Sequence, residues 1–307
     1  MAKEKTKIKA LLLMSGGLDS ILAAKLLQNQ GISVTPICFK SFFFGCDQAQ
    51  KACKQLGLKL MEIDFSKKYL TMLRSPKYGM GSAMNPCIDC HLLMLKEAKK
   101  IMKAGEYDFV ATGEVLGERP MSQNPRALNI IEKEAGLKGY LLRPLSAKIM
   151  EETIPEKKGL VNREKLEAIN GRSRKPQLEL VKKFGIKEFP TPGGGCILTD
   201  KNYSENLKKI LEFKKNPNEN DFLIIRQGRV FWKNNILIVV ARDKSESKML
   251  KKIHQIKDVY LEPKNFSGPS VIIRAFGKAN KKELIIFGRE YLLKFSKNIP
   301  NNPKISE

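Results

Sequence analysis

Residues 8–20 read IKALLLMSGGLDS, an apolar run followed directly by a turn with two adjacent glycines. The run from Ile8 to Met14 is typical of a buried parallel strand. After the turn, apolar side chains recur at helical spacing from Ser20 to Gln30, and Gly31 ends that helix. A strand, a tight turn and a helix in this order predict the first unit of an α/β fold.

The alternation of strands and helices continues along the first 200 residues. Further strands are expected at 32–39, 58–64, 107–112 and 140–143, and helices at 45–56 and 88–102. Residues 147–185 are expected to be largely helical, with interruptions near Pro155 to Gly159 and near Gly171, and the segment from Thr191 through Gly195 to be a loop. Short connections between these elements predict a doubly wound parallel sheet with helices on both faces.

From about residue 200 the pattern changes to short strands with helices between them. The expected helices are 203–215, 244–254 and 280–296, and the expected strands are 221–226, 229–233, 235–241, 258–261 and 270–275. The last ten residues are polar and are expected to be loose. We therefore expect two domains, an α/β domain over 1–200 and a smaller α+β domain over 201–307.

The chain carries 56 Lys and Arg against 32 Asp and Glu, a net charge of +24, and both expected domains are basic. Codon usage of an AT-rich genome is one explanation, and a polyanionic ligand such as nucleic acid is the other. Clean apolar runs such as Ala10 to Met14 are far shorter than the roughly 18 residues that cross a bilayer. This predicts a cytoplasmic protein that does not associate with membranes.

The turn after the first strand has the chemistry of a phosphate site. Gly16 and Gly17 let the backbone approach a ligand closely, and the amides at the start of the helix favour an anion. Ser15 and Ser20 add hydroxyl groups, and Asp19 is suited to orient Mg²⁺ held with phosphates. The spacing of a Walker A loop is absent.

The SGGLDS turn resembles the PP-loop of the ATP pyrophosphatases. Other stretches are similar to motifs of tRNA 4-thiouridine synthetases and tRNA 2-thiouridylases: Ala111–Glu118, Ser122–Gln123, Leu142–Leu145, Asn85–Cys87 and Gly194–Asp200. The resemblance covers about residues 8–200. It implies an ATP-dependent tRNA sulfurtransferase that adenylylates a uridine carbonyl and replaces its oxygen with sulfur, at position 2 or position 4.

The resemblance also implies roles for single residues. Those expected to bind ATP are Ser15, Gly16, Gly17, Asp19, Ser20, Phe39, Gly113, Ser122 and Gln123. Asp19 is the expected catalytic Mg²⁺ group, and Phe39 either lines the adenine pocket or belongs to the core. Glu114 is a further candidate for contact with the nucleotide or the tRNA.

Cys87 and Cys90 form a C-x-x-C pair, and Cys196 follows far along the chain. From the residues alone, a persulfide pair, an iron–sulfur cluster and a zinc site with His91 all remain open. The resemblance implies that the three cysteines hold a [4Fe–4S] cluster whose open iron carries sulfur from sulfide or a cysteine desulfurase. That arrangement needs the loop at 193–195 to fold back over the start of the helix at Ile88.

The other three cysteines, Cys38, Cys46 and Cys53, are interpreted as small core residues. Residues 236–275 resemble the RNA-binding domain of the NFACT proteins, which implies tRNA as the partner. The candidate RNA-binding residues are Arg172, Arg174, Lys175, Arg242, Lys244, Lys248, Lys251, Lys252, Lys264 and Arg274, with Trp232 and Phe266 as stacking or core residues.

Two alternative functions stay open, an amidating PP-loop enzyme acting on a small molecule and a non-enzymatic RNA-binding factor. A homodimer is a candidate assembly.

Overall fold

A computed structural model describes residues 7–191 and 196–306 of the chain. It divides into two compact units, Met1–Cys196 and Ile197–Glu307. No helix within the described ranges is long and apolar enough to cross a membrane.

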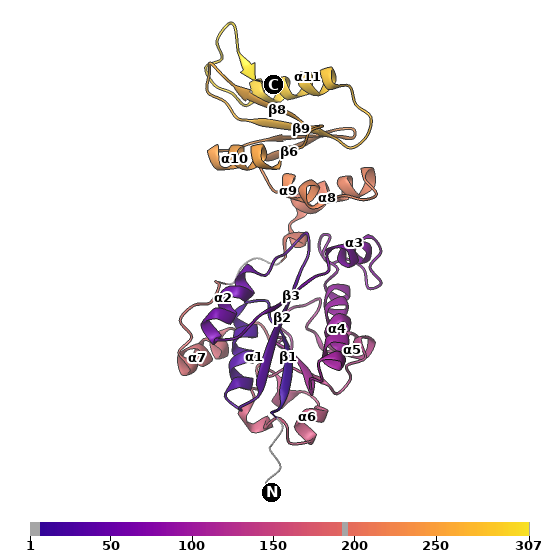
Figure 1. The fold of residues 1–307 in the computed structure, drawn as a ribbon, viewed down its shortest axis with the longest axis vertical. Helices are drawn as coiled ribbons and strands as arrows, with labels where there is room; N and C mark the ends of the chain where they lie inside the picture. The colour runs from indigo at the N-terminus through magenta and orange to yellow at the C-terminus, as the bar shows by residue number, and fades with distance from the viewer. Residues whose placement is uncertain (1–6, 192–195, 307) are drawn as a thin grey trace. The chain divides into compact units, whose positions relative to one another are not determined.

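The first unit is built on a five-stranded parallel sheet in the order β3-β2-β1-β4-β5 (Figure 1). Its strands are β1 (Lys9–Leu13), β2 (Ser33–Lys40), β3 (Met61–Asp64), β4 (Phe109–Thr112) and β5 (Leu141–Leu142). The central strand β1 pairs with β2 on one side and β4 on the other. Leu11 and Leu12, on opposite faces of β1, are both fully buried, as the continuous apolar run predicts.

Helices cover both faces of this sheet, which confirms the doubly wound α/β class. In Figure 1, α1 (Leu18–Gln28), α2 (Asp47–Leu56) and α7 (Lys175–Phe184) lie on one side, and α4 (Cys87–Ala104) and α5 (Pro125–Ala135) on the other. The helix α3 (Ser66–Arg74) packs against α4. Neither α3 nor α5 was expected from the sequence, although Asn124 and Pro125 are a recognisable start for a helix.

The expectation of a largely helical segment over 147–185 is wrong for most of its length. Apart from α7, it holds only the short helix α6 (Ile154–Lys157) and the 3₁₀ turns η1 (Ala147–Ile149) and η2 (Arg163–Lys165). A capping box between Thr153 and Glu156 begins α6, but Gly159 takes a positive φ of 68° and the helix does not continue.

The second unit is an antiparallel sheet in the order β10-β8-β9-β7-β6, which confirms the α+β class. Its strands are β6 (Arg229–Lys233), β7 (Ile236–Val240), β8 (Val259–Pro263), β9 (Val271–Ala275) and β10 (Ile305–Ser306). Its helical segments are η3 (Ile197–Thr199), α8 (Lys201–Phe213), α9 (Glu219–Ile224), α10 (Lys244–Ile253) and α11 (Lys281–Lys294). A Cβ at Gly288 of α11 would lie 2.5 Å from Ile273 Cδ1, so this helix approaches the sheet closely.

Two expectations for this unit are wrong. The stretch expected as a strand at 221–226 begins inside α9, because Asn218 and Asp221 form a capping box that starts a helix there. The last ten residues are not all loose, because Ile305 and Ser306 pair with Pro263 and Glu262 of β8.

Candidate functional site

The phosphate turn lies at the point where the strand order of the first sheet reverses. Residues 15–20 follow β1, and Gly113 follows its neighbour β4. The chain leaves β1 toward β2 on one side and later returns to β4 on the other. In open α/β sheets, ligands bind outside the carboxyl ends of the strands at such a reversal.

Two glycines make the turn sterically possible. Gly16 has a φ of +79°, and a Cβ there would lie 2.2 Å from the backbone carbonyl carbon of Gln48. A Cβ at Gly113 would lie 2.5 Å from the Ser20 nitrogen. Any side chain at either position would therefore push the turn away from α2 or from β4.

Hydrogen bonds inside the turn fix its shape. The Ser20 hydroxyl donates to the Gly17 carbonyl at 2.8 Å, and the Gly17 amide donates to Ser15 Oγ at 3.2 Å. Within the described residues, no side chain caps the start of α1, whose N-cap residue is Gly17. The first amides of α1 are thus left to a ligand, and the positive end of the helix dipole favours an anion.

Asp19 lies in the first turn of α1 and is half-buried. Gln177 Nε2 of α7 donates to Asp19 Oδ1 at 3.3 Å. Burial raises the pKa of Asp19, while the bond from Gln177 and the charges of Arg174 and Arg119 oppose that rise. Burial and the neighbouring Asp19 likewise raise the pKa of Glu118. Two carboxylates and two guanidinium groups therefore share this site.

The three basic residues expected to bind RNA around the start of α7 do not share one environment. Arg172 and Lys175 are exposed. Arg174, the N-cap residue of α7, is half-buried and acts electrostatically on both Asp19 and Glu118. The structure thus places Arg174 with the phosphate turn rather than with its exposed neighbours.

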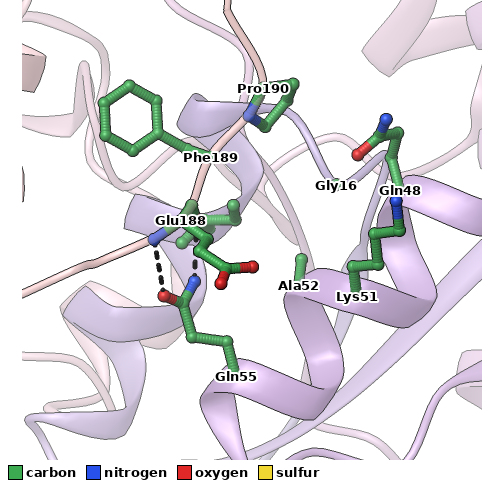
Figure 2. Close-up of a pocket in the computed structure, with 9 residues that line it drawn as sticks. Gly16, Gln48, Lys51, Ala52, Gln55, Glu188, Phe189 and Pro190 are labelled. Carbon is green, nitrogen blue, oxygen red and sulfur yellow. Dashed lines mark hydrogen bonds between the residues drawn. The ribbon is translucent and has the colours of Figure 1, made fainter.

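A cavity of about 180 Å³ adjoins the other side of the turn (Figure 2). Gly16 forms part of its wall, α2 contributes Gln48 and Lys51, and the opposite wall is the segment from Glu188 to Pro190. The Gln55 side chain holds that segment, since its Nε2 donates to the Glu188 carbonyl at 2.8 Å and its Oε1 accepts from the Glu188 amide at 2.9 Å.

Glu114 does not face a ligand, in contrast to the expectation from sequence. It is 5% exposed and accepts hydrogen bonds from Arg143 Nε at 2.9 Å and Thr112 Oγ1 at 3.0 Å. Its other oxygen lies 2.7 Å from His91 Nδ1. Burial alone would raise the pKa of Glu114, but Arg143 and His91 outweigh it and lower the pKa to about 2. Glu114 therefore joins β4, α4 and the segment after β5.

Phe39 belongs to the core rather than to an adenine pocket. It is 4% exposed, and its ring packs 5.2 Å from that of Phe65. Ser122 is also buried, and the Gln123 carbonyl accepts a hydrogen bond from the Gly117 amide. These contacts shape the loop after β4; whether either residue touches a nucleotide stays a prediction.

Cys87 and Cys90 begin α4, and both are half-buried, whereas Cys196 is exposed. Asn85 Nδ2 donates to Cys87 Sγ at 3.3 Å. Burial raises the pKa of Cys90 to about 12, while an interaction with the Tyr69 hydroxyl partly opposes that rise. Burial raises the pKa of Tyr69, and the thiols of Cys90, Cys196 and Cys87 add to that rise, which indicates that all three lie within electrostatic range of the Tyr69 hydroxyl.

This neighbourhood is not a formed metal site. Over residues 7–191 and 196–306, no group of three or more His, Cys, Asp or Glu side chains is placed to hold a metal ion. The loop at 193–195, which was expected to close over α4, lies outside the described residues. The iron–sulfur cluster therefore stays a prediction. Cys38, Cys46 and Cys53 are buried in the core, as expected.

In the second unit, Arg274 is not available for RNA. It is 4% exposed, and all three of its guanidinium nitrogens donate hydrogen bonds. The acceptors are Asp258 at 2.9 and 2.7 Å, Asp221 at 3.1 Å, Asn220 at 2.8 Å and the Ile253 carbonyl at 3.3 Å. The expectation was wrong because the GPSVIIR stretch places Arg274 on a central strand.

The lysines of α10 are exposed, as RNA binding requires. Lys248 and Lys252 reach solvent, Lys251 lies 3.8 Å from Glu262, and Arg242 is paired with Glu246. Trp232 is half-buried: its Nε1 donates to Asn206 Oδ1 at 2.8 Å, and its ring centroid lies 5.9 Å from that of Phe213 and 5.6 Å from that of Phe276. A stacking role for Trp232 stays a prediction.

Sequence reasoning missed a second group of basic residues in this unit. Arg229 lies 5.2 Å from the ring centroid of Phe295, and Lys233 lies 4.2 Å from that of Phe287. Gln177, Tyr69 and the His91–Glu114 pair were missed as well. All of these associations join segments far apart in the sequence, which local patterns do not report.

A family model described as the tRNA methyl transferase HUP domain matches residues 8–170, more than half of the chain. The chain belongs to this family. A second model, the NFACT protein RNA binding domain, matches residues 228–304 and confirms that resemblance.

Curated relatives of this family member are named as tRNA-specific 2-thiouridylases. MnmA of Tolumonas auensis is 27% identical over 166 residues, which cover 49% of this chain and 45% of the relative. The mitochondrial tRNA-specific 2-thiouridylase 1 of Drosophila melanogaster is 26% identical over 244 residues, covering 71% and 58%. The chain thus spans about half the length of the curated relatives it matches.

Two solved structures are similar to this chain at lower sequence identity. The U34-tRNA thiolase NcsA from Methanococcus maripaludis, solved with its [4Fe-4S] cluster, is 20% identical with a TM-score of 0.37, covering 72% of this chain and 71% of that chain. A 4-thiouridine synthetase–RNA complex with bound ATP is 20% identical with a TM-score of 0.38, covering 58% and 51%. Overlap this weak carries no argument about function.

Proposed function

We propose that this protein is an ATP-dependent tRNA sulfurtransferase. The observation that carries the proposal is the phosphate turn, formed at the sheet reversal with uncapped α1 amides and with Asp19 beside it. Family membership and relatives named 2-thiouridylases support tRNA thiolation, and those names favour position 2 of a uridine.

In the proposed reaction, the uridine carbonyl oxygen attacks the α-phosphorus of ATP. The bond to the bridging oxygen breaks, pyrophosphate leaves with that electron pair, and an adenylylated uridine forms. The α1 amides and the Ser15 hydroxyl bind the phosphates, which lowers the barrier because charge spreads over these oxygens. Asp19 is the group suited to orient Mg²⁺ with the phosphates.

The sulfur atom then attacks the activated carbon of the uridine. The bond from that carbon to the adenylylated oxygen breaks, and AMP leaves with that oxygen. Cys87, Cys90 and Cys196 are the proposed sulfur-handling set, because all three lie within electrostatic range of the Tyr69 hydroxyl. A [4Fe–4S] cluster bound by three cysteines would supply an open iron for sulfide. The sulfur donor is proposed to be sulfide or a desulfurase persulfide.

The second unit, with its exposed lysines and the matched NFACT model, is proposed to bind the tRNA. In this arrangement the α/β domain over 1–200 carries out the chemistry, and residues 201–307 add affinity for the RNA backbone.

The test is to incubate the purified protein with ATP, Mg²⁺ and unmodified tRNA and to identify the nucleotide products and the tRNA nucleosides by mass spectrometry. We expect AMP, pyrophosphate and a thiouridine, and Asp19→Ala should abolish all three. Release of ADP and phosphate instead would show that the proposed adenylylation is wrong. The two isomers 2-thiouridine and 4-thiouridine have the same mass, so their chromatographic retention and ultraviolet absorption distinguish them.

A further inference from the structure

The start of α7 forms a wall of the phosphate site that no sequence motif marked. Gln177 is fully buried, and its Nε2 holds Asp19 Oδ1 at 3.3 Å. Arg174, one turn earlier, is the N-cap residue of the same helix. Since α1 and α7 pack against each other, both residues face the start of α1.

Two polar atoms of this wall are buried and unpaired. Across the described residues, neither Gln177 Oε1 nor Arg174 Nε has a hydrogen-bond partner. Leaving a buried polar atom unpaired destabilises the folded chain, so native proteins hold few such atoms. Arg174 Nε is a donor that a phosphate oxygen can complete, whereas Gln177 Oε1 is an acceptor and needs a donor, such as a water bound to Mg²⁺. Both atoms lie beside an uncapped helix start, which indicates that a ligand with its bound water completes the site.

The charges around this wall indicate what the ligand is. Arg174 comes from α7, and Arg119 from the segment after β4, and both act on Asp19 and Glu118. The α1 amides contribute the positive end of a helix dipole at the same place. A guanidinium group presents a planar fork that matches phosphate oxygens. The ligand is therefore a phosphate-bearing anion that also tolerates two carboxylates, as a metal-bound polyphosphate does.

We propose that Arg174 binds the pyrophosphate portion of ATP and stabilises pyrophosphate as it leaves. Negative charge develops on the bridging oxygen as its bond to the α-phosphorus breaks, and the guanidinium group of Arg174 neutralises part of it. The role replaces the RNA contact that the sequence suggested for this residue. It rests on the proposed adenylylating function, but the binding of pyrophosphate can be measured without any turnover.

Arg172 provides a matched control, because it carries the same charge two residues away and is exposed. We would titrate inorganic pyrophosphate with Mg²⁺ into the full chain and its variants by calorimetry, with AMP and tRNA as separate ligands. Arg174→Ala should weaken pyrophosphate binding about 10- to 100-fold, the effect of losing a charged hydrogen bond. AMP affinity should change less, and Arg172→Ala should leave pyrophosphate affinity unchanged.

Arg174→Lys keeps the charge and the stem, so it remains informative if the alanine variant is poorly folded. A lysine cannot reproduce the fork, and we expect it to recover only part of the affinity. If both variants bind pyrophosphate as the native chain does, or if the native chain does not bind it, the proposal is overturned. A loss confined to tRNA affinity would likewise overturn it and restore the RNA role.

The two proposals fail separately. Release of AMP by a native chain whose Arg174 variants bind pyrophosphate normally would retain the sulfurtransferase function and remove the arginine's role. Release of ADP by a native chain that needs Arg174 to bind pyrophosphate would retain the arginine's role and remove the sulfurtransferase function.

Discussion

Arg174 beside the phosphate turn is half-buried, and Arg274 in the second unit is buried. The two side chains differ in their hydrogen-bond partners. All three guanidinium nitrogens of Arg274 donate to side chains or backbone of its own unit. The buried Nε of Arg174 has no such partner among the residues that the structure describes. A saturated arginine stabilises a fold, whereas an unsaturated one beside a helix start is prepared for an anion. Hydrogen-bond completeness, together with the position of Arg174 beside a helix start, therefore distinguishes these two arginines where charge alone does not.

The largest expected effect concerns the cysteines. Changing Cys87, Cys90 or Cys196 to Ala should abolish thiolation of tRNA, because each belongs to the proposed sulfur-handling set, while ATP binding at the turn is retained. Cys53→Ala is the matched control, since Cys53 is buried in the core away from α4. Thiolation is followed by mass spectrometry of tRNA nucleosides. Full activity of Cys196→Ala would contradict the three-cysteine set.

The cluster itself has a separate readout. If the three cysteines bind a [4Fe–4S] cluster, anaerobically reconstituted protein should contain about four iron and four sulfide per chain. Bound zinc without iron would leave a cysteine persulfide as the sulfur carrier.

The next effect tests the saturated arginine. Arg274→Met should lower the free energy of unfolding by about 3–5 kcal/mol, because it leaves Asp221 and Asp258 buried without their cation. Urea denaturation followed by the fluorescence of Trp232, the one tryptophan of the chain, measures this. Lys252→Met, at an exposed position, should change it by about 0.5 kcal/mol or less. Equal stability of the two variants would remove the contrast between Arg174 and Arg274.

A smaller effect is expected from acid. The pKa of Glu114 is about 2 in the folded chain and 4.5 ordinarily. A depressed carboxyl pKa stabilises the fold above the unfolded value, and that contribution is lost as the pH falls from about 4.5 toward 2. The urea concentration at the midpoint of unfolding of the first unit, which contains Glu114, should therefore drop over this pH window. Glu114→Gln should make that drop smaller. An unchanged slope in the variant would assign acid sensitivity to other groups.

The smallest effect is expected at the exposed lysines of α10. Replacing Lys248 and Lys252 with Gln should weaken tRNA binding at low salt and lower the steepness of its salt dependence by about one per lost phosphate contact. The matched comparison replaces Arg229, which lies over Phe295 at the end of α11, and Lys233, which lies over Phe287 within α11. Fluorescence anisotropy with labelled tRNA measures both. If neither pair alters the salt dependence, the second unit does not bind the RNA backbone.

Much of the fold followed from local pattern. The apolar run before SGGLDS is typical of a buried strand, and Gly16 in the turn after it is the glycine that the backbone of Gln48 approaches closely. Turn chemistry and 3.6-residue spacing are properties of neighbouring residues, so a single sequence displays them. The parallel sheet, the phosphate turn and most helices of both units were predicted on this basis.

Partners distant in the sequence were decided by the tertiary structure. Gln177 meets Asp19 across 158 positions, and Arg143 meets Glu114 across 29. Sequence shows that Arg174, Arg274 and Glu114 are charged, but the use of each charge depends on which acceptors the fold brings within about 3 Å. Burial and hydrogen-bond saturation are properties of the packed chain. Phe39, Glu114 and Arg274 were expected to bind a ligand or RNA, but the fold buries them, and their contacts within the protein stabilise it.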